Sequence, residues 1–228
     1  MKVIAPSHEI LFMPEGRAML ANLELAGRTC YKSEEHISEQ SAQGFVRRII
    51  ASGHHSVIEH ASVSVRFVCD RGVTHELVRH RLAAFSQEST RYANYSQDKF
   101  GGEITVIRPL FWPPGTQAHD RWLTAMAQAE EAYLELLRLG AKPQEARSVL
   151  PNSLKTEIVM TANLREWRHV INLRASKASH PQMREIILPL LAHFQARLPV
   201  VFDDLYEKYQ ADVAEMAHWL ARLDGPGA

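Results

Sequence analysis

The segment Ser62-Val-Ser-Val-Arg-Phe-Val-Cys-Asp70 alternates apolar and polar side chains. The apolar positions are Val63, Val65, Phe67 and Cys69, and Ser64 and Arg66 stand between them. A period of two is typical of a strand that buries one face. The sequence therefore predicts a half-buried strand over residues 62–70, and shorter strands are predicted at residues 2–5 and 103–107.

Helical patterns dominate the rest of the chain, above all its second half. The strongest covers residues 117–139, where Trp122, Met126 and Tyr133 recur at helical spacing. Residues 156–161 fit a strand or a helix. Helices are predicted at residues 15–28, 40–52, 73–82, 117–139, 143–149, 164–176, 182–198 and 202–223. We expect an α+β fold with a helix-rich C-terminal half, formed by one domain over residues 1–228.

Composition narrows the class of protein and its location. Hydrophobic residues make up 46% and charged residues 23% of the 228 residues, which is typical of a globular protein and excludes a disordered chain. The formal net charge of zero argues against a general nucleic-acid or polybasic membrane binder. Only Cys30 and Cys69 occur, which indicates a reducing compartment. The strongest apolar run, residues 186–192, contains Pro189 and is too short to span a bilayer. With no signal peptide apparent, we expect a cytoplasmic protein with no membrane or nucleic-acid partner.

Familiar cofactor motifs are missing from the sequence. It contains no P-loop and no Gly-rich dinucleotide fingerprint. His75 and His80 lie five residues apart, which on a helix separates them by roughly 140° and removes a shared ligand face. His55 and His60 miss the inverted zincin spacing by one residue in the same way. We therefore predict no metal site.

The densest polar segment reads Arg79-His80-Arg81-Leu-Ala-Ala-Phe-Ser86-Gln87-Glu88-Ser89-Thr90-Arg91-Tyr92. Arginine forks and hydroxyls at a helix end can wrap an anion, but composition alone fits a solvated polar surface equally well. On a continuous helix Arg79 and Arg81 would point roughly 200° apart. They can serve one site only by gripping different parts of a large ligand, or if the helix ends between them.

This segment resembles the signature of the flavin-dependent thymidylate synthases. Arg79-His80-Arg81 is followed after seven residues by Ser89 and then Arg91. Further matching segments occur in the same order over about residues 28–180. They are Gly53-His54-x-Ser56-x-x-Glu59-His60, Arg147 before Leu150-Pro151, Asn163-x-Arg165 with His169, Asn172-Leu173-Arg174-Ala175, and His180.

The resemblance implies a reaction and an assembly. It implies an enzyme of the methyltransferase class that converts dUMP to dTMP. The carbon donor would be 5,10-methylenetetrahydrofolate, the reductant NADPH and the redox relay FAD. It further implies a mixed or antiparallel sheet packed with helices, in a homotetramer whose active sites are shared between subunits.

The resemblance also implies roles for individual residues. FAD contacts would fall on Ser56, Arg79, His80, Arg81, Gln87, Asn163, Leu164, Arg165 and His169, with His54 near the flavin ring. Contacts to dUMP would fall on Glu76, Leu77, Val78, Arg79, Gln87, Glu88, Ser89, Thr90, Arg91, Arg147 and Arg174. Arg174 would be catalytic, since it matches the residue that polarises the pyrimidine and favours ionisation at N3. Cys30 matches a cofactor-side position and Cys69 falls on the apolar face of a strand, so neither is expected to be a nucleophile.

Four positions differ from the commonest family pattern: Glu76, Ser86, Gln87 and His169. The Glu76 carboxylate needs a cationic neighbour or water if it lies near a phosphate. Arg165 and His169 share a helix face, whereas Arg174 points roughly 180° from Arg165, so one helix could not aim both arginines at one small ligand.

Two other functions stay open at this point. One is a binder of nucleotides or single-stranded nucleic acid that uses Phe85, Tyr92 and Tyr95 as stacking platforms. The other is a flavoprotein of the same fold that reduces a different substrate.

Overall fold

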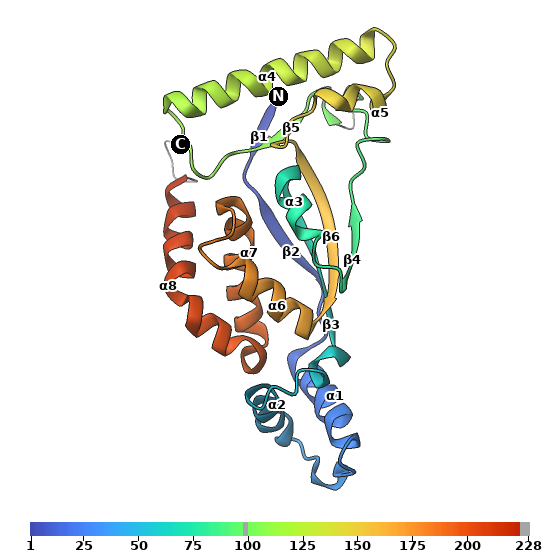
Figure 1. The fold of residues 1–228 in the computed structure, drawn as a ribbon, viewed down its shortest axis with the longest axis vertical. Coiled ribbons are helices and arrows are strands. Elements are labelled where there is room, and N and C mark those ends of the chain that lie inside the picture. Colours follow the sequence, from blue (N-terminus) through green and yellow to red (C-terminus); the bar gives the residue numbers. More distant parts are fainter. Residues whose placement is uncertain (98–99, 224–228) are drawn as a thin grey trace.

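The computed structural model describes residues 1–97 and 100–223 and contains two sheets (Figure 1). The larger sheet is antiparallel, with the strand order β2 (Ser7–Phe12), β3 (Ser62–Asp70), β6 (Lys155–Asn163) and β4 (Ala83–Gln87). The smaller sheet pairs β1 (Lys2–Ile4) in parallel with β5 (Thr105–Ile107). With the helices described below, this confirms the α+β prediction.

The central strand pair, β3 and β6, has one buried face. The apolar positions predicted for β3 are buried, and they pair with buried positions of β6: Val63 with Ala162, Val65 with Met160, Phe67 with Ile158 and Cys69 with Thr156. The opposite face is half-buried and polar, where Arg66 pairs with Glu9 and Glu157. This alternation settles residues 156–161 as strand.

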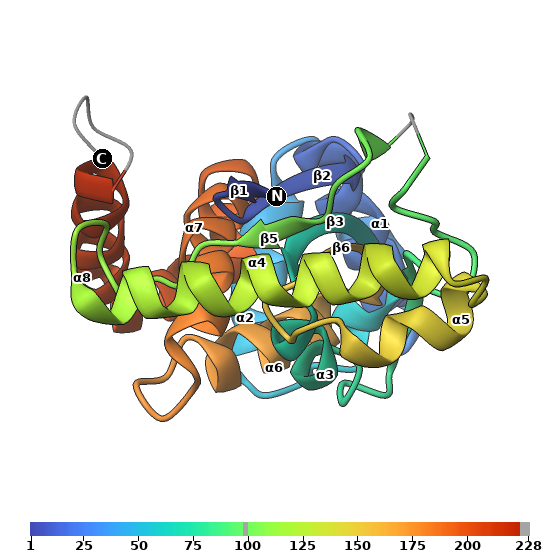
Figure 2. The same cartoon turned by 90° about the horizontal axis from the view of Figure 1, so that it is seen from above.

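Helices surround the larger sheet on one side and at both ends (Figure 1). They are α1 (Gly16–Thr29), α2 (Ser41–Ala51), α3 (Arg71–Leu77), α4 (Gln117–Arg138), α5 (Pro143–Ala146), α6 (Leu164–Arg174), α7 (Pro181–Arg197) and α8 (Pro199–Leu223). Short 3₁₀ turns are η1 (Glu34–His36), η2 (Val57–His60) and η4 (Arg147–Val149). Figure 2 shows α4 crossing over β1 and β5. In the described part of the chain, no helix combines the length and apolar character needed to cross a membrane.

Helix α6 is fixed to the sheet by a buried tryptophan. The Trp167 Nε1–H donates to the Val63 carbonyl of β3 at 3.0 Å, and its ring packs edge-on against Phe194 of α7 with centroids 5.3 Å apart. Trp167, Val63 and Phe194 are fully buried. The orientation of α6 relative to the sheet is thus set by one hydrogen bond and close aromatic packing.

Some sequence predictions were wrong in detail. The helix predicted over residues 73–82 begins at Arg71, capped by the Asp70 carboxylate that accepts from the Val73 N–H at 2.8 Å, and it ends at Leu77. The strands β2 and β4 were missed, since their short edge segments lack a long alternating pattern. The helix predicted at residues 143–149 divides into α5 and η4.

Truncation of Ile158 to Ala should lower the free energy of unfolding by about 3 kcal/mol, because a fully buried side chain is lost from the shared core face. The matched control is Val159→Ala on the half-buried face, with an expected cost of about 1 kcal/mol. Denaturant unfolding measures both. Equal costs for the two variants would contradict the assignment of the buried face.

Candidate active site

The turn after α3 points one side chain of Arg79-His80-Arg81 inward. The Arg79 N–H donates to the Glu76 carbonyl and the His80 N–H to the Leu77 carbonyl, which closes the turn at 3.2 and 3.1 Å. His80 is 4% exposed, whereas Arg79 and Arg81 are exposed. The helix ends before both arginines, so the helical geometry that separated them does not apply.

Arg174, at the end of α6, contacts this turn with all three guanidinium nitrogens. Its Nε–H donates to Nε2 of His80 at 3.0 Å, and its two terminal nitrogens donate to the Glu76 carboxylate at 2.7 Å and the Glu76 carbonyl at 3.2 Å. Glu76 therefore has the cationic neighbour that its charge requires. The structure thus brings Arg174 to Glu76 and His80, which lie 98 and 94 positions before it in the sequence.

His80 is neutral in this arrangement. An arginine Nε–H can only donate, so Nε2 of His80 accepts and the ring proton resides on Nδ1. Burial lowers the pKa of His80 to about 4, with further lowering by the positive charge of Arg174 and by His169. Near neutral pH, therefore, the His80 imidazole is neutral and accepts the hydrogen bond from Arg174.

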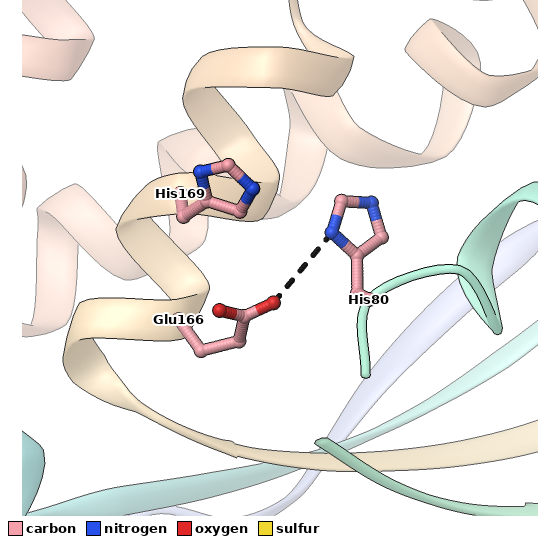
Figure 3. Close-up of side chains that lie close together, drawn as sticks. All are labelled: His80, Glu166 and His169. Carbon is pink, nitrogen blue, oxygen red and sulfur yellow. Dashed lines mark ion pairs between the residues drawn. The ribbon is translucent and has the colours of Figure 1, made fainter. Parts of the chain in front are cut away.

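Two further α6 side chains face His80 (Figure 3). Glu166 Oε1 lies 3.6 Å from Nδ1 of His80, and the His169 ring lies 5.8 Å from the His80 ring, centroid to centroid. One ligand atom from each of these three side chains lies within 4.8 Å of the others. Because the Arg174 guanidinium already contacts His80, a metal ion here would place two positive charges side by side, and we interpret Glu166 as an electrostatic neighbour of His80. Sequence reasoning missed Glu166, although its i,i+3 spacing from His169 could have indicated a shared face.

The end of β4 and the loop after it carry residues 87–91 of the dUMP prediction. The Gln87 amide donates to the hydroxyls of Thr74 and Thr156 at 3.0 and 3.3 Å. Arg147 reaches the loop from η4 and donates to the Thr90 hydroxyl at 3.3 Å. The Ser89 hydroxyl accepts from the Arg91 N–H at 3.3 Å. The Arg147 guanidinium thus reaches the loop that carries the Ser89 and Thr90 hydroxyls.

Glu88 turns away from these hydroxyls. Its carboxylate accepts from the Tyr95 hydroxyl at 3.1 Å and from Lys155 at 3.2 Å. Burial acts to lower the pKa of Lys155, but its bonds to Glu157 and Glu88 outweigh this and raise it. The Glu88 side chain therefore belongs to a network of charges beside the loop.

A second polar group lies along α6 and α8. A pocket of about 460 Å³ is lined by His55, Arg165, Arg168, His169, Asn172, Asp204, Leu205 and Lys208. Arg168 forms a bidentate pair with Asp204 at 2.7 and 2.6 Å, and Arg165 pairs with Glu59 at 2.5 Å. Lys208 donates to the Asn172 side chain at 2.8 Å. Since the lining holds three cations and one carboxylate, the pocket suits an anionic ligand.

Other predicted residues lie outside these contacts. Leu77 and Leu164 are fully buried core side chains, and Asn163 caps α6 by accepting from the Glu166 N–H at 2.9 Å. Val78, His54 and Ser56 are exposed. As the helical spacing indicated, Arg165 and Arg174 do not meet, because one pairs with Glu59 and the other with Glu76. Lys208 was missed because α8 lies outside the matched motifs.

A half-buried arginine held by a neutral histidine, beside an arginine–hydroxyl loop and a basic pocket, is typical of an enzyme that binds phosphorylated ligands. A family model described as thymidylate synthase complementing protein matches residues 17–200. The flavin-dependent thymidylate synthase of Corynebacterium glutamicum is 34% identical over 216 residues, which cover 86% of this chain and 84% of that protein. Those of Mycolicibacterium vanbaalenii and Mycobacterium tuberculosis are 36% identical over 219 and 209 residues, with the same shares covered. The chain belongs to the flavin-dependent thymidylate synthase family and is an enzyme of that class.

The depressed pKa of His80 predicts a pH dependence of stability. The unfolded chain binds a proton at this ring below about pH 6.5, whereas the folded protein resists protonation until about pH 4. Stability therefore falls as the pH drops through this window. Replacement of His80 by Gln should reduce the slope of the unfolding free energy against pH, by an amount equal to the uptake of up to one proton on unfolding. Unfolding free energies of both proteins from pH 4 to 7 measure the effect, and a wild-type-to-variant difference that does not change with pH would contradict it.

Proposed function

We propose that this enzyme converts dUMP to dTMP, with 5,10-methylenetetrahydrofolate as carbon donor and NADPH as reductant through bound FAD. The observation that carries the proposal is the Arg174 guanidinium, held by His80 and Glu76 within a chain of this family. No cysteine nucleophile takes part in the proposed reaction.

The substrate would lie between Arg174 and the loop after β4. A nucleotide phosphate carries about two negative charges near neutral pH. The guanidinium groups of Arg147 and Arg91 and the hydroxyls of Ser89 and Thr90 would bind that phosphate. Arg174 would then face the pyrimidine, where its charge stabilises the anionic ring that forms when N3 ionises. Glu76 and His80 would hold the guanidinium in that orientation.

The proposed flavin site uses the pocket beside α6. Arg165, Lys208 and His169 line it, and their charge and hydrogen-bond donors suit a pyrophosphate. The predicted FAD contacts Ser56 and His54 lie just before η2, whose Glu59 pairs with Arg165. When bound, FAD supplies the hydride chemistry that the side chains lack.

The environments of the two thiols support a route without cysteine. Cys69 is 1% exposed, and burial raises the pKa of its thiol further above the physiological range. Cys30 is exposed directly after α1, outside the Arg174 cluster. A nucleophilic cysteine needs an accessible thiolate beside the reacting atoms, which burial denies Cys69 and position denies Cys30.

We also propose a cytoplasmic homotetramer in which more than one subunit builds each site. The exposure of Arg79 and Arg81 fits shared sites, because it leaves both guanidinium groups free to reach a ligand held partly by another subunit. The nucleic-acid alternative is weakened by Tyr95, a proposed stacking ring that is 5% exposed and packs against Tyr133.

The direct test is dTMP formation, without oxygen, from dUMP, methylenetetrahydrofolate and NADPH, with and without added FAD. We expect product only when flavin is bound, and the loss of nearly all product in Arg174→Ala. Flavin binding and NADPH oxidation that ignore dUMP would indicate a different flavin reaction. Wild-type activity in Arg174→Ala would refute the role of Arg174.

Arg165→Ala should weaken FAD binding by about tenfold or more, because a charge that faces the pyrophosphate is removed. Arg138→Ala is the matched control, since Arg138 is also an exposed helical arginine paired with a carboxylate, Glu135 of α4. Flavin fluorescence titration gives both dissociation constants. The same constant for both variants would place the cofactor elsewhere.

A further inference from the structure

Glu166 is a buried carboxylate that the proposed reaction does not use. It is 6% exposed and lies in the first turn of α6, where its N–H is held by the Asn163 cap. Its carboxylate oxygen Oε1 lies 3.6 Å from Nδ1 of His80. A buried carboxylate lowers the stability of the fold unless it is paired with a polar or charged group.

The two ring nitrogens of His80 must differ in protonation. Nε2 must be unprotonated, because it accepts from the Arg174 Nε–H at 3.0 Å. Nδ1 must then carry the proton, and it is the nitrogen that faces the Glu166 carboxylate. An acceptor oxygen on that side is matched only by a protonated nitrogen, so it favours the Nδ1–H tautomer over the Nε2–H tautomer, which would direct a proton at the Arg174 donor.

We propose that Glu166 is a positioning residue for the reaction. Glu166 acts on Arg174 through His80. It selects the Nδ1–H tautomer of His80, so that Nε2 accepts from Arg174 and the guanidinium keeps the orientation in which it meets the pyrimidine. The chain of contacts runs from Glu166 through His80 to Arg174 and ends at Glu76. The catalytic part of this inference rests on the proposed function, whereas the tautomer part does not.

The kinetic test is a double-mutant cycle between Glu166→Leu and Arg174→Lys. Lysine keeps a positive charge but lacks the Nε–H that meets His80. Glu166→Leu should lower kcat for dTMP formation by about tenfold or more in the wild-type background, since a histidine in the wrong tautomer no longer orients its partner. In the Arg174→Lys background the same change should cost less than twofold. Equal factors in both backgrounds would overturn the proposal and indicate a structural role.

A second variant distinguishes a loss of positioning from a loss of folding in Glu166→Leu. Glu166→Gln preserves size and an acceptor oxygen, and it should restore most of the activity lost in Glu166→Leu. The matched control is Glu24→Gln, a buried helical glutamate of α1 bonded to Arg28 and Ser41, which should lower stability without changing kcat. No rescue by Glu166→Gln would contradict selection of the tautomer through an acceptor.

A spectroscopic test is independent of turnover. In protein labelled with ¹⁵N-histidine, long-range ¹⁵N–¹H spectra identify which ring nitrogen bears the proton, and His80→Gln assigns the signals. We expect the Nδ1–H form in the wild type and its loss in Glu166→Leu. This result together with an absence of dTMP formation would refute the proposed function and leave intact the selection of the His80 tautomer by Glu166. An unchanged tautomer in the variant would refute the positioning role. A chelator-sensitive activity restored by Zn²⁺ would also refute it, because Glu166 would then be a metal ligand.

Discussion

The hydrogen bond from Arg174 to a neutral, buried His80 is the interaction on which the proposed active site depends. Arginine stays charged at all physiological pH values, so its partner must be an acceptor. Histidine is an acceptor only when it is neutral, and burial beside a guanidinium keeps it so by lowering its pKa. The Glu76 carboxylate balances the charge that these contacts bring into a half-buried position.

The sheet brings the two halves of this contact together. β4 starts its pairing with Ala83 opposite Ala162, so the turn that carries His80 lies near the end of β6. Helix α6 starts directly after that strand end, capped by Asn163 and fixed by Trp167. Register, cap and core packing therefore determine where Arg174 lies, although none of these features touches it.

Much of the fold followed from local patterns. The alternation in residues 62–70 predicted β3 with its correct bounds, and the helical spacing around Tyr133 predicted α4. The strands β2 and β4 were not predictable in this way, because edge strands of five or six residues depend on their pairing partners. The end of α3 at Leu77 was missed for a related reason. The pairing of β4 with β6, which starts at Ala83, requires the chain to leave the helix before residue 82.

The site was predictable only as a set of residues. Motif order identified Arg79, His80, Arg147 and Arg174, but spacing along the chain could not show that His80 alone turns inward. Glu166 and Lys208 carry no motif, and they enter the site through the packing of α6 against its neighbours.

In the proposed reaction the Arg174 guanidinium, and not a thiol, acts on the pyrimidine. The most direct measurement is the single-turnover rate of dTMP formation by the flavin-loaded Cys30→Ser/Cys69→Ala protein. We predict a rate within about threefold of the wild type, since one thiol lies in the core and the other lies outside the Arg174 cluster. A folded, flavin-loaded variant that forms no dTMP would contradict the claim.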